Sequence, residues 1–427
     1  MKVVKIVLFV FLSVTVVLTA FTSGFYVAGQ TDTTSAAAAF QLPSARAATS
    51  PNDVPKQFQT LNEVWRVLRE EFIDGKDLDA DKLGKAAIDG MLSALDDRHT
   101  HFLDRQTREA ENSALRGSYE GIGAHVQMDE GVLTIVAPLA GSPAEAAGIR
   151  AGDKILALDG VNLQGMNLSE AVAKVKGPKG SKITLTIQRQ GSSTQQPIEV
   201  TRDEIKTASV VLGMQPDGFA HIRISQFGQR TADELRDALS SAKRQNAKGL
   251  VLDLRNNPGG LLDATVEITN MFLDGGIAGY QVDKNGKRET LRLSGKGEYT
   301  DIPLAVLVNG GSASGSELLA GALQDRNRAK LVGTTTYGKG SVNHLKELTD
   351  RSALYVTIGR WLTPNGRLIE GNGLTPDFLI AITEDDIKAM RDVAAAMAPN
   401  STSPSVALLD ADPQMKKARE LLRGGGR

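Results

Sequence analysis

The stretch that decides this sequence is Asn309-Gly310-Gly311-Ser312-Ala313-Ser314-Gly315-Ser316-Glu317. The apolar run before it, residues 304–308, predicts a buried strand, and the apolar run after it, residues 318–323, predicts a helix packed on a sheet. Ser314 would then lie in a strand-to-helix turn, where backbone N–H groups are free and the helix dipole favours negative charge. This place suits a serine nucleophile beside an oxyanion hole. A flexible loop of small residues is the other interpretation.

A second stretch, Gly333-Thr334-Thr335-Thr336-Tyr337-Gly338-Lys339-Gly340, offers a base for that serine. Lys339 lies between two glycines, which let the backbone bend so that the side chain can point toward a neighbouring strand end. A buried lysine loses the solvation of its charged form, so its pKa falls and it can accept the Ser314 proton. A solvated loop lysine is the alternative interpretation.

Strands and helices alternate in the C-terminal half of the chain. A strand is expected over residues 250–254 and a helix over residues 261–273. This rhythm predicts an α/β core with a partly parallel sheet and right-handed crossovers. Sites in such sheets gather beyond the carboxyl ends of the strands. Gly260, Ser314 and Lys339 each follow such an end, so we expect them to converge.

Three motifs in order carry a resemblance to a known family. They are Asp253-Leu-Arg-Asn-Asn-Pro-Gly-Gly260, Ser-Ala-Ser-x-Ser-Glu at 312–317 and Tyr-Gly-Lys-Gly-Ser-Val at 337–342. Together, and with the spacing from Ser314 to Lys339, they resemble the C-terminal processing (tail-specific) serine peptidases from about residue 55 to the C-terminus. The resemblance implies a serine endopeptidase with a Ser-Lys dyad and no cofactor, acting on proteins with accessible C-termini.

The same resemblance assigns further roles near the dyad. It implies that the backbone N–H groups of Gly260 and Gly315 form the oxyanion hole. Relatives usually carry alanine at the place of Gly315, a change that keeps the backbone donor. Asn343 occupies a position where relatives commonly carry a glutamine that hydrogen-bonds the lysine, and asparagine is shorter.

Residues 119–206 resemble a PDZ domain, inserted within the protease. The resemblance rests on Ser142-Pro143-Ala144, on residues 147–153 and on residues 155–160. In that fold a peptide adds as an extra strand, and a glycine-containing loop captures its terminal carboxylate. By resemblance this substrate C-terminus-binding loop is Gly121, Ile122, Gly123 and Ala124, with Ala124 where a larger apolar residue is usual. Lys176 occupies a place where relatives often carry an arginine that faces the protease body.

The N-terminus predicts export. Lys2 and Lys5 precede an apolar run from residue 6 to residue 20, as in a secretory signal. The apolar trend to residue 29 is also long enough to span a bilayer. Residues 1–29 are therefore expected to be either an uncleaved membrane anchor or a cleaved signal peptide, and residues 30–55 a disordered tether. Both readings place the protein in the bacterial cell envelope, anchored in the membrane or periplasmic.

Length and composition set the remaining organisation. The chain of 427 residues predicts two or three domains, and its net charge of −1 gives no indication of a nucleic-acid partner. The absence of cysteine excludes disulfides and thiolate chemistry. We expect a helical segment over 56–118, the protease core over 207–384 and a helical segment over 385–427, whose last helix opens at Asp412-Pro413. These terminal helices would supply a homo-oligomer contact or pack on their own body.

Rival functions have weaker signals. His99 and His101 have no third metal ligand patterned nearby, so no metal site is expected. The segment from Gly333 to Lys339 is nearly a P-loop, but Gly340 replaces the serine or threonine that binds magnesium. The serious alternative is a non-catalytic PDZ scaffold on an inactive protease body.

Overall fold

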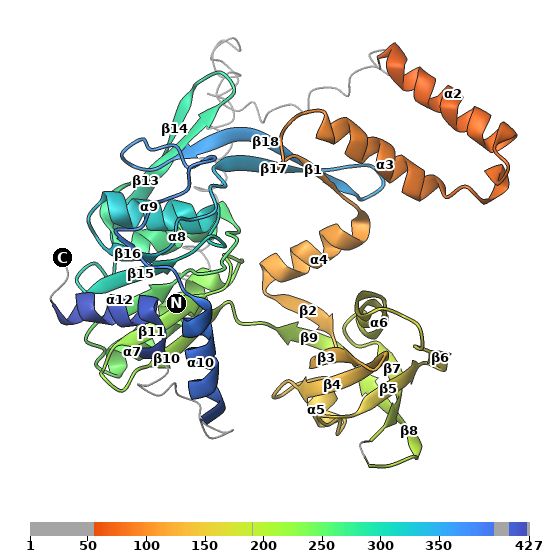
Figure 1. Ribbon diagram of the computed structural model, residues 1–427, viewed down its shortest axis with the longest axis horizontal. Coiled ribbons are helices and arrows are strands. Elements are labelled where there is room, and N and C mark those ends of the chain that lie inside the picture. The colour runs from red at the N-terminus through yellow and green to blue at the C-terminus, as the bar shows by residue number, and fades with distance from the viewer. Residues whose placement is uncertain (1–54, 190, 397–409, 425–427) are drawn as a thin grey trace, which may run out of the picture. The chain divides into compact units, whose positions relative to one another are not determined.

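The computed structural model describes residues 55–189, 191–396 and 410–424 (Figure 1). The chain divides into two compact units, Met1–Gly84 and Lys85–Arg427. The expected signal segment, residues 1–29, and all of the expected tether except residue 55 lie outside the described residues. Within the described ranges, no helix is both long and apolar enough to cross a membrane.

The first unit contains α2 (Lys56–Glu71), η2 (Gly75–Asp77) and the start of α3 (Ala80–Ser93). Helix α2 therefore begins where the helical segment 56–118 was expected to begin. No residue of α2 is buried, and several of its large apolar side chains are exposed: Phe58, Leu61, Val64 and Val67.

The expected helical segment 56–118 is not helical throughout. After α3 the chain forms β1 (His101–Leu103), which pairs antiparallel with β18 (Ala353–Leu362), and only then α4 (Arg105–Arg116). A three-residue strand has too few residues to show a period, and its partner lies far away in the sequence. Asp104 caps α4 by accepting a hydrogen bond from the Thr107 N–H at 2.8 Å.

The region expected to be a PDZ domain has its own sheet and core. The sheet runs in the order β3 (Ala124–Asp129), β4 (Val132–Pro138), β5 (Lys154–Leu158), β7 (Lys182–Gln188) and β8 (Gln195–Thr201), with β6 (Val161–Asn162) paired to β5. Two helices accompany it, α5 (Pro143–Ala146) and α6 (Leu168–Val175). The strands that lead in and out, β2 (Ser118–Gly121) and β9 (Asp203–Lys206), pair with each other. Both ends of the inserted domain therefore lie side by side.

The central sheet confirms the predicted α/β core. Its order is β10 (Val210–Met214), β11 (Ala220–Ile224), β12 (Leu250–Asp253), β15 (Leu304–Val308), β16 (Lys330–Gly333) and β19 (Phe378–Leu379). All neighbours from β11 to β19 are parallel, and β10 is antiparallel to β11. One face packs against α7 (Thr231–Arg244), α8 (Leu262–Phe272) and α9 (Gly315–Asp325), and the other against α12 (Pro413–Arg423). Helix α10 (Glu384–Ala396) precedes α12.

A second, antiparallel sheet was not predicted. It consists of β1, β18, β13 (Asp274–Asp283) and β14 (Arg288–Lys296), with β17 (Ser341–Glu347) paired to β18. Strands β13 and β14, and β17 and β18, pair with their neighbours in the sequence, whereas β18 joins the distant strands β1 and β13 into one sheet. The sheet matters for the site because β17 begins directly after the Lys339 loop.

Candidate active site

Ser314 lies in the turn between β15 and α9, as the sequence predicts. It is partly buried, and its backbone adopts φ 54° and ψ −114°. A positive φ at a non-glycine residue costs of order 1–3 kcal/mol and persists only where the surroundings impose it. The strain therefore calls for a contact that holds the turn.

The Glu317 carboxylate is that contact. It is 0% exposed, and its Oε2 accepts hydrogen bonds from the backbone N–H groups of Ser314 at 2.8 Å and Lys339 at 2.9 Å. Its Oε1 accepts from Thr336 Oγ1 at 2.6 Å and from the Gly338 N–H at 2.7 Å. Burial raises the pKa of Glu317, while these four donors act in the opposite direction. One side chain thus joins the turn around Ser314, called the serine turn below, to the loop that carries Thr336, Gly338 and Lys339, called the lysine loop.

Lys339 is only partly buried, whereas the sequence interpretation expected a buried lysine. Glu317 holds its backbone, but within the described part of the chain its ammonium makes no hydrogen bond or ion pair. Ser314 Oγ and Lys339 Nζ are accordingly not hydrogen-bonded to each other. The fold therefore brings the two loops together without closing the dyad.

Residues 254–260, which end at the predicted oxyanion donor Gly260 and are called the oxyanion loop below, contact the serine turn. A Cβ atom added to Gly259 would lie 2.8 Å from Ser314 Cβ and 2.9 Å from the Gly315 nitrogen. Gly260 has φ 148°, and an added Cβ there would meet the Phe227 carbonyl oxygen at 2.2 Å, so the position requires glycine. Among the described residues, nothing accepts a hydrogen bond from the Gly260 or Gly315 N–H. Neither donor is therefore occupied by another group in the described part of the chain.

Asn257 fastens these two loops to each other. Its carbonyl oxygen accepts hydrogen bonds from the Ala313 N–H at 3.0 Å and from Ser316 Oγ at 2.8 Å. Its buried side chain donates to the Ile224 carbonyl at 3.0 Å and accepts from the Gly259 N–H at 2.9 Å. The oxyanion loop and the serine turn are therefore one hydrogen-bonded unit.

Asn343 lies on β17, and its side-chain amide is occupied elsewhere. Its Nδ2 donates to the His99 carbonyl at 3.0 Å and to Thr357 Oγ1 at 3.1 Å, and its Oδ1 accepts from Ser341 Oγ at 2.9 Å. None of these partners is Lys339. The expected contact with the lysine stays a prediction.

The turn at 97–100 packs near the Lys339 loop, which the sequence interpretation missed. His99 is 8% exposed, and its Nε2 lies 3.3 Å from Glu370 Oε1. Burial lowers the pKa of His99; the Lys339 and Arg98 cations act in the same direction, and the Glu370 and Asp97 carboxylates oppose them. Among the described residues, no group of three or more His, Asp or Glu side chains could hold a metal ion.

The predicted carboxylate-binding loop lines a groove of about 220 Å³ between β3 and α6. Gly121, Ile122, Gly123 and Ala124 form one wall, and the others are Tyr119, Val126, Val172, Val175 and Lys176. Gly123 has φ 74°, and an added Cβ would lie 2.5 Å from Ser142 Cβ, so glycine is needed there. Within the described ranges, the Ile122 and Gly123 N–H groups donate to no other residue. They can serve an incoming carboxylate.

Lys176 makes its contact inside this region. Its Nζ lies 5.3 Å from the centroid of the Tyr119 ring, at one end of the groove. Lys176 and Tyr119 both line the groove, so this contact belongs to the groove wall. The expected contact with the protease body stays a prediction.

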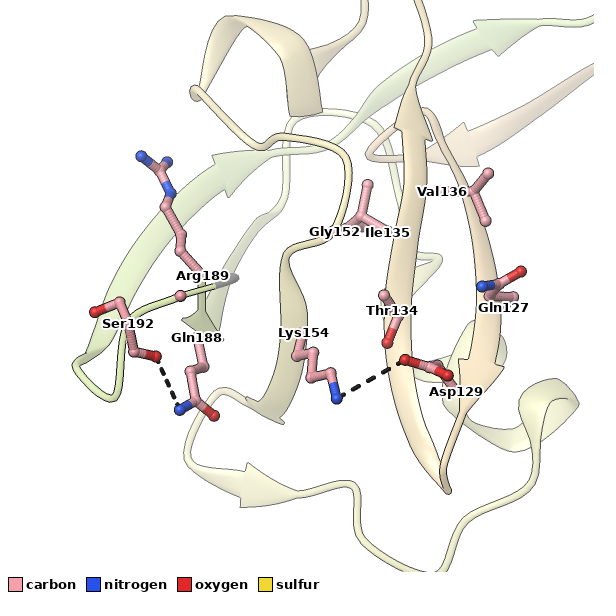
Figure 2. A pocket seen from close by; sticks show the side chains of 11 residues that line it. Gln127, Asp129, Thr134, Ile135, Val136, Gly152, Lys154, Gln188, Arg189 and Ser192 are labelled. Atoms are coloured by element: carbon pink, nitrogen blue, oxygen red, sulfur yellow. Dashed lines mark hydrogen bonds and ion pairs between the residues drawn. The ribbon is translucent and has the colours of Figure 1, made fainter.

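A second hollow of about 590 Å³ lies over β3, β4, β5 and β7 of the same domain (Figure 2). It is open and lined largely by polar side chains, among them Lys154, whose Nζ is 3.8 Å from Asp129 Oδ2. It contains none of the predicted site residues and none of the unpaired loop N–H groups. We assign it no part in the site, although it is larger than the groove.

Replacing Glu317 with glutamine should destabilise the protein. Whichever way the amide is oriented, its NH₂ group faces two of the four donors that the carboxylate now accepts. Each unsatisfied buried donor costs roughly 1–3 kcal/mol, so the free energy of unfolding should fall by about 2–5 kcal/mol in a urea titration. Glu298→Gln at an exposed position is the matched control and should stay within about 0.5 kcal/mol of the unchanged protein. Equal stability of the two variants would contradict the role of Glu317.

His99 should make stability depend on pH. The unfolded chain protonates this histidine near pH 6.5, whereas the folded chain resists protonation because the pKa of His99 is lowered. The unfolded state therefore binds more protons below that pH, and the free energy of unfolding falls as the pH falls. His99→Gln should lose less stability between about pH 7.5 and about pH 5.5, measured as urea midpoints at both values. Equal losses in both proteins would show that His99 does not contribute.

Comparison with known proteins finds separate matches for the protease core and for the PDZ region of the chain. A model described as peptidase family S41 matches residues 218–380, and one described as a PDZ domain matches residues 134–189. The chain is 38% identical over 321 residues to the carboxy-terminal processing protease CtpA of Bacillus subtilis (strain 168), covering 75% of this chain and 68% of that protein. It is also 38% identical over 322 residues to a probable CtpA-like serine protease of Staphylococcus aureus (strain COL), covering 75% of this chain and 64% of that protein.

A solved structure titled photosystem II D1 C-terminal processing protease is 29% identical, with a TM-score of 0.45, covering 80% of this chain and 97% of that one. The TM-score is low, so the assignment rests on the sequence relatives. Their identity and coverage show that this chain belongs to peptidase family S41, the carboxy-terminal processing serine proteases, and the second match shows that it carries a PDZ domain.

Proposed function

We propose that this chain is an envelope serine endopeptidase that recognises substrate C-termini through its PDZ domain and cleaves with a Ser314–Lys339 dyad. One observation carries the proposal: the buried Glu317 carboxylate accepts hydrogen bonds from the backbones of both residues. Nucleophile and base are thereby held on adjoining loops. The unpaired N–H groups of Gly260 and Gly315 beside them support an oxyanion hole.

The chemistry follows the order of these groups. Ser314 Oγ attacks the scissile carbonyl carbon, and Lys339 Nζ takes the hydroxyl proton. The N–H groups of Gly260 and Gly315 donate to the developing oxyanion, where loss of one such donor costs roughly 3–4 kcal/mol. As the intermediate collapses, Lys339 returns the proton to the leaving amine. Water then hydrolyses the acyl-enzyme, with Lys339 again as the base.

Catalysis by this route requires the Lys339 side chain to turn toward Ser314, because the two are not hydrogen-bonded in the structure. A resting state with an open dyad suits a protease that must spare folded proteins. The signal that closes the dyad is, in this proposal, a substrate C-terminus docked in the groove at Gly121–Ala124. The free N–H groups of Ile122 and Gly123 and the cation of Lys176 support that assignment, because all three favour an anion.

The proposed place of action is the bacterial cell envelope. The basic N-terminus and the apolar run that follows support export and contact with the membrane, either as an anchor or as a signal that is removed. The exposed apolar side chains of α2 support a homo-oligomer contact through the N-terminal helices. Nothing in the charge balance supports a nucleic-acid partner.

The alternative is a PDZ scaffold on an inactive protease body. The open dyad is the observation that favours it. Serine, lysine and both oxyanion donors are nevertheless all present at one site, and a scaffold would need none of them. Activity assays on dyad variants separate the two functions.

Ser314→Ala and Lys339→Ala should each abolish cleavage of a disordered protein substrate and leave the fold intact, because the pair acts as one unit. Lys339→Arg should be equally inactive, since a guanidinium does not lose its proton in proteins. Ser294→Ala and Lys296→Ala, at exposed positions on β14, are the matched controls and should retain activity. Turnover by any of the three dyad variants would remove the assignment, and inactivity of the unchanged protein would favour the scaffold.

A free C-terminal peptide too short to be cut should raise cleavage of a second substrate that lacks a good C-terminal motif. Docking of the peptide would favour the closed dyad, and a ligand shifts an equilibrium only by binding one state better. The same peptide with an amidated C-terminus should activate less, because the loop N–H groups lose their anion. Inhibition at every peptide concentration would leave the PDZ domain as a simple tether.

A further inference from the structure

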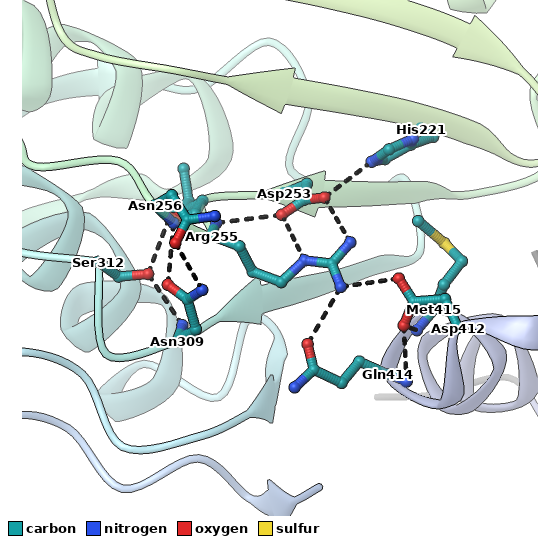
Figure 3. A network of polar contacts seen from close by, with 10 residues as sticks. His221, Asp253, Arg255, Asn256, Asn309, Ser312, Asp412, Gln414 and Met415 are labelled. Atoms are coloured by element: carbon teal, nitrogen blue, oxygen red, sulfur yellow. Dashed lines mark hydrogen bonds and ion pairs between the residues drawn. The ribbon is translucent and has the colours of Figure 1, made fainter. Parts of the chain in front are cut away.

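Arg255 joins the C-terminal helix α12 to the end of a central strand (Figure 3). Its Nε and Nη2 donate to the two carboxylate oxygens of Asp253 at 2.9 and 2.8 Å. Its Nη1 donates to Asp412 Oδ2 at 2.8 Å and to Gln414 Oε1 at 3.1 Å. The guanidinium is therefore held between β12 and the first turn of α12.

The strand side of this contact is rigid. Asp253 is 2% exposed and also lies 3.1 Å from His221 Nε2 on β11. Although burial opposes ionisation, the hydrogen bonds from His221 and Arg255 hold the pKa of Asp253 well below its usual range. The fork of Arg255 is thus bound to a fully ionised, buried partner, which is the geometry that fixes a guanidinium most firmly.

On the helix side of the contact, the two carboxylate oxygens of Asp412 have different partners. Asp412 Oδ1 caps α12 by accepting from the backbone N–H groups of Gln414 and Met415, both at 3.0 Å. Asp412 Oδ2 is left for Arg255. The helix itself is anchored separately, because Met415, Ala418 and Leu422 pack on the central sheet. The cap and the arginine contact can therefore be removed independently.

The residues on either side of Arg255 hold the serine turn. Asn256 and Asn309 exchange two hydrogen bonds, from the Asn256 N–H to Asn309 Oδ1 and from Asn309 Nδ2 to Asn256 Oδ1, both at 2.9 Å. The Leu254 carbonyl accepts from Ser312 Oγ at 2.8 Å. Movement of Arg255 would shift these contacts and, beyond them, the loop that ends at Gly260.

We propose that Arg255 is a positioning residue through which the docked first turn of α12 sets the geometry of the oxyanion loop. The chain of contacts runs from Asp412 through Arg255 to residues 254–256, and from there to both the serine turn and the Gly260 N–H. Arg255 acts on catalysis only through this backbone. The inference rests on the proposed function, in which the Gly260 and Gly315 N–H groups stabilise the oxyanion.

Asp412→Asn tests this coupling. Asparagine keeps an oxygen for the helix cap but presents an amide to Arg255, so kcat on a peptide substrate should fall roughly tenfold with KM little changed, less than the loss of a whole oxyanion donor. Arg255→Lys, which keeps the charge but loses the fork, should lower kcat at least as much. Asp410→Asn is the matched control. Asp410, which precedes α12, pairs with Arg419 of α12 at 2.8 Å and does not contact Arg255. It should leave kcat within about twofold of the unchanged protein.

Amide hydrogen exchange gives a readout that does not need activity. Several backbone N–H groups of residues 254–261 are hydrogen-bonded in the unchanged protein. These groups should exchange faster in Asp412→Asn than in Asp410→Asn. Equal kcat in Asp412→Asn and the unchanged protein, or equal losses in both aspartate variants, would overturn the inference. If the unchanged protein cuts nothing, the proposed function fails, and the exchange result alone decides whether α12 positions the loop.

Discussion

A single buried carboxylate organises the candidate active site. An ionised side chain without water is tolerated only where hydrogen-bond donors surround it, so Glu317 requires donors to converge on it. They come from two loops: Ser314 on one, and Thr336, Gly338 and Lys339 on the other. The strained backbone of Ser314 and the position of the lysine loop are therefore consequences of satisfying one charge. The turn around Ser314 and the loop around Lys339 are thus joined through the side chain of a third residue.

The parallel sheet makes that convergence possible. Strands β12, β15 and β16 are neighbours, and each ends at the same edge, where the loops of Gly260, Ser314 and Lys339 begin. Adjacent strands lie about 4.8 Å apart, so loops that leave neighbouring strand ends must touch. Asn257 then converts that proximity into a fixed arrangement, because its backbone and side chain bind both the serine turn and the oxyanion loop. Hydrogen bonds therefore hold the backbone of the site, whereas the Lys339 ammonium makes none among the described residues.

The PDZ domain is inserted in the chain, so both of its ends are joined to the protease. Strands β2 and β9 pair, so the domain enters and leaves the core at one place. A ligand in its groove is then connected to the protease at both ends of the insertion, unlike a domain attached at a terminus. The α12 contact through Arg255 reaches the oxyanion loop and the serine turn from the C-terminal part of the chain.

Much of the architecture could be predicted from local sequence. The apolar runs around Ser314 predicted β15 and α9 because each is long enough to show its type by itself. The order of three motifs identified the protease family, and separate motifs identified the PDZ domain. The pairing of β1 with β18 escaped prediction, since these strands are separated by more than half of the chain. The same limit applied to single residues: nothing near Asn343 in the sequence points to His99, and nothing near Lys176 distinguishes Tyr119 from the protease body as its partner.

The sequence by itself therefore determined the family and the strands and helices of the central sheet around Ser314, because motifs and periodicity act over a few neighbouring residues. Only the tertiary structure decided how those residues are held. The partners of Glu317 and Arg255 come from distant segments, and hydrogen bonds of that kind exist only once the sheet has brought the loops together. Whether Lys339 points at Ser314 is likewise a property of packing, and in this structure the packing leaves the dyad open.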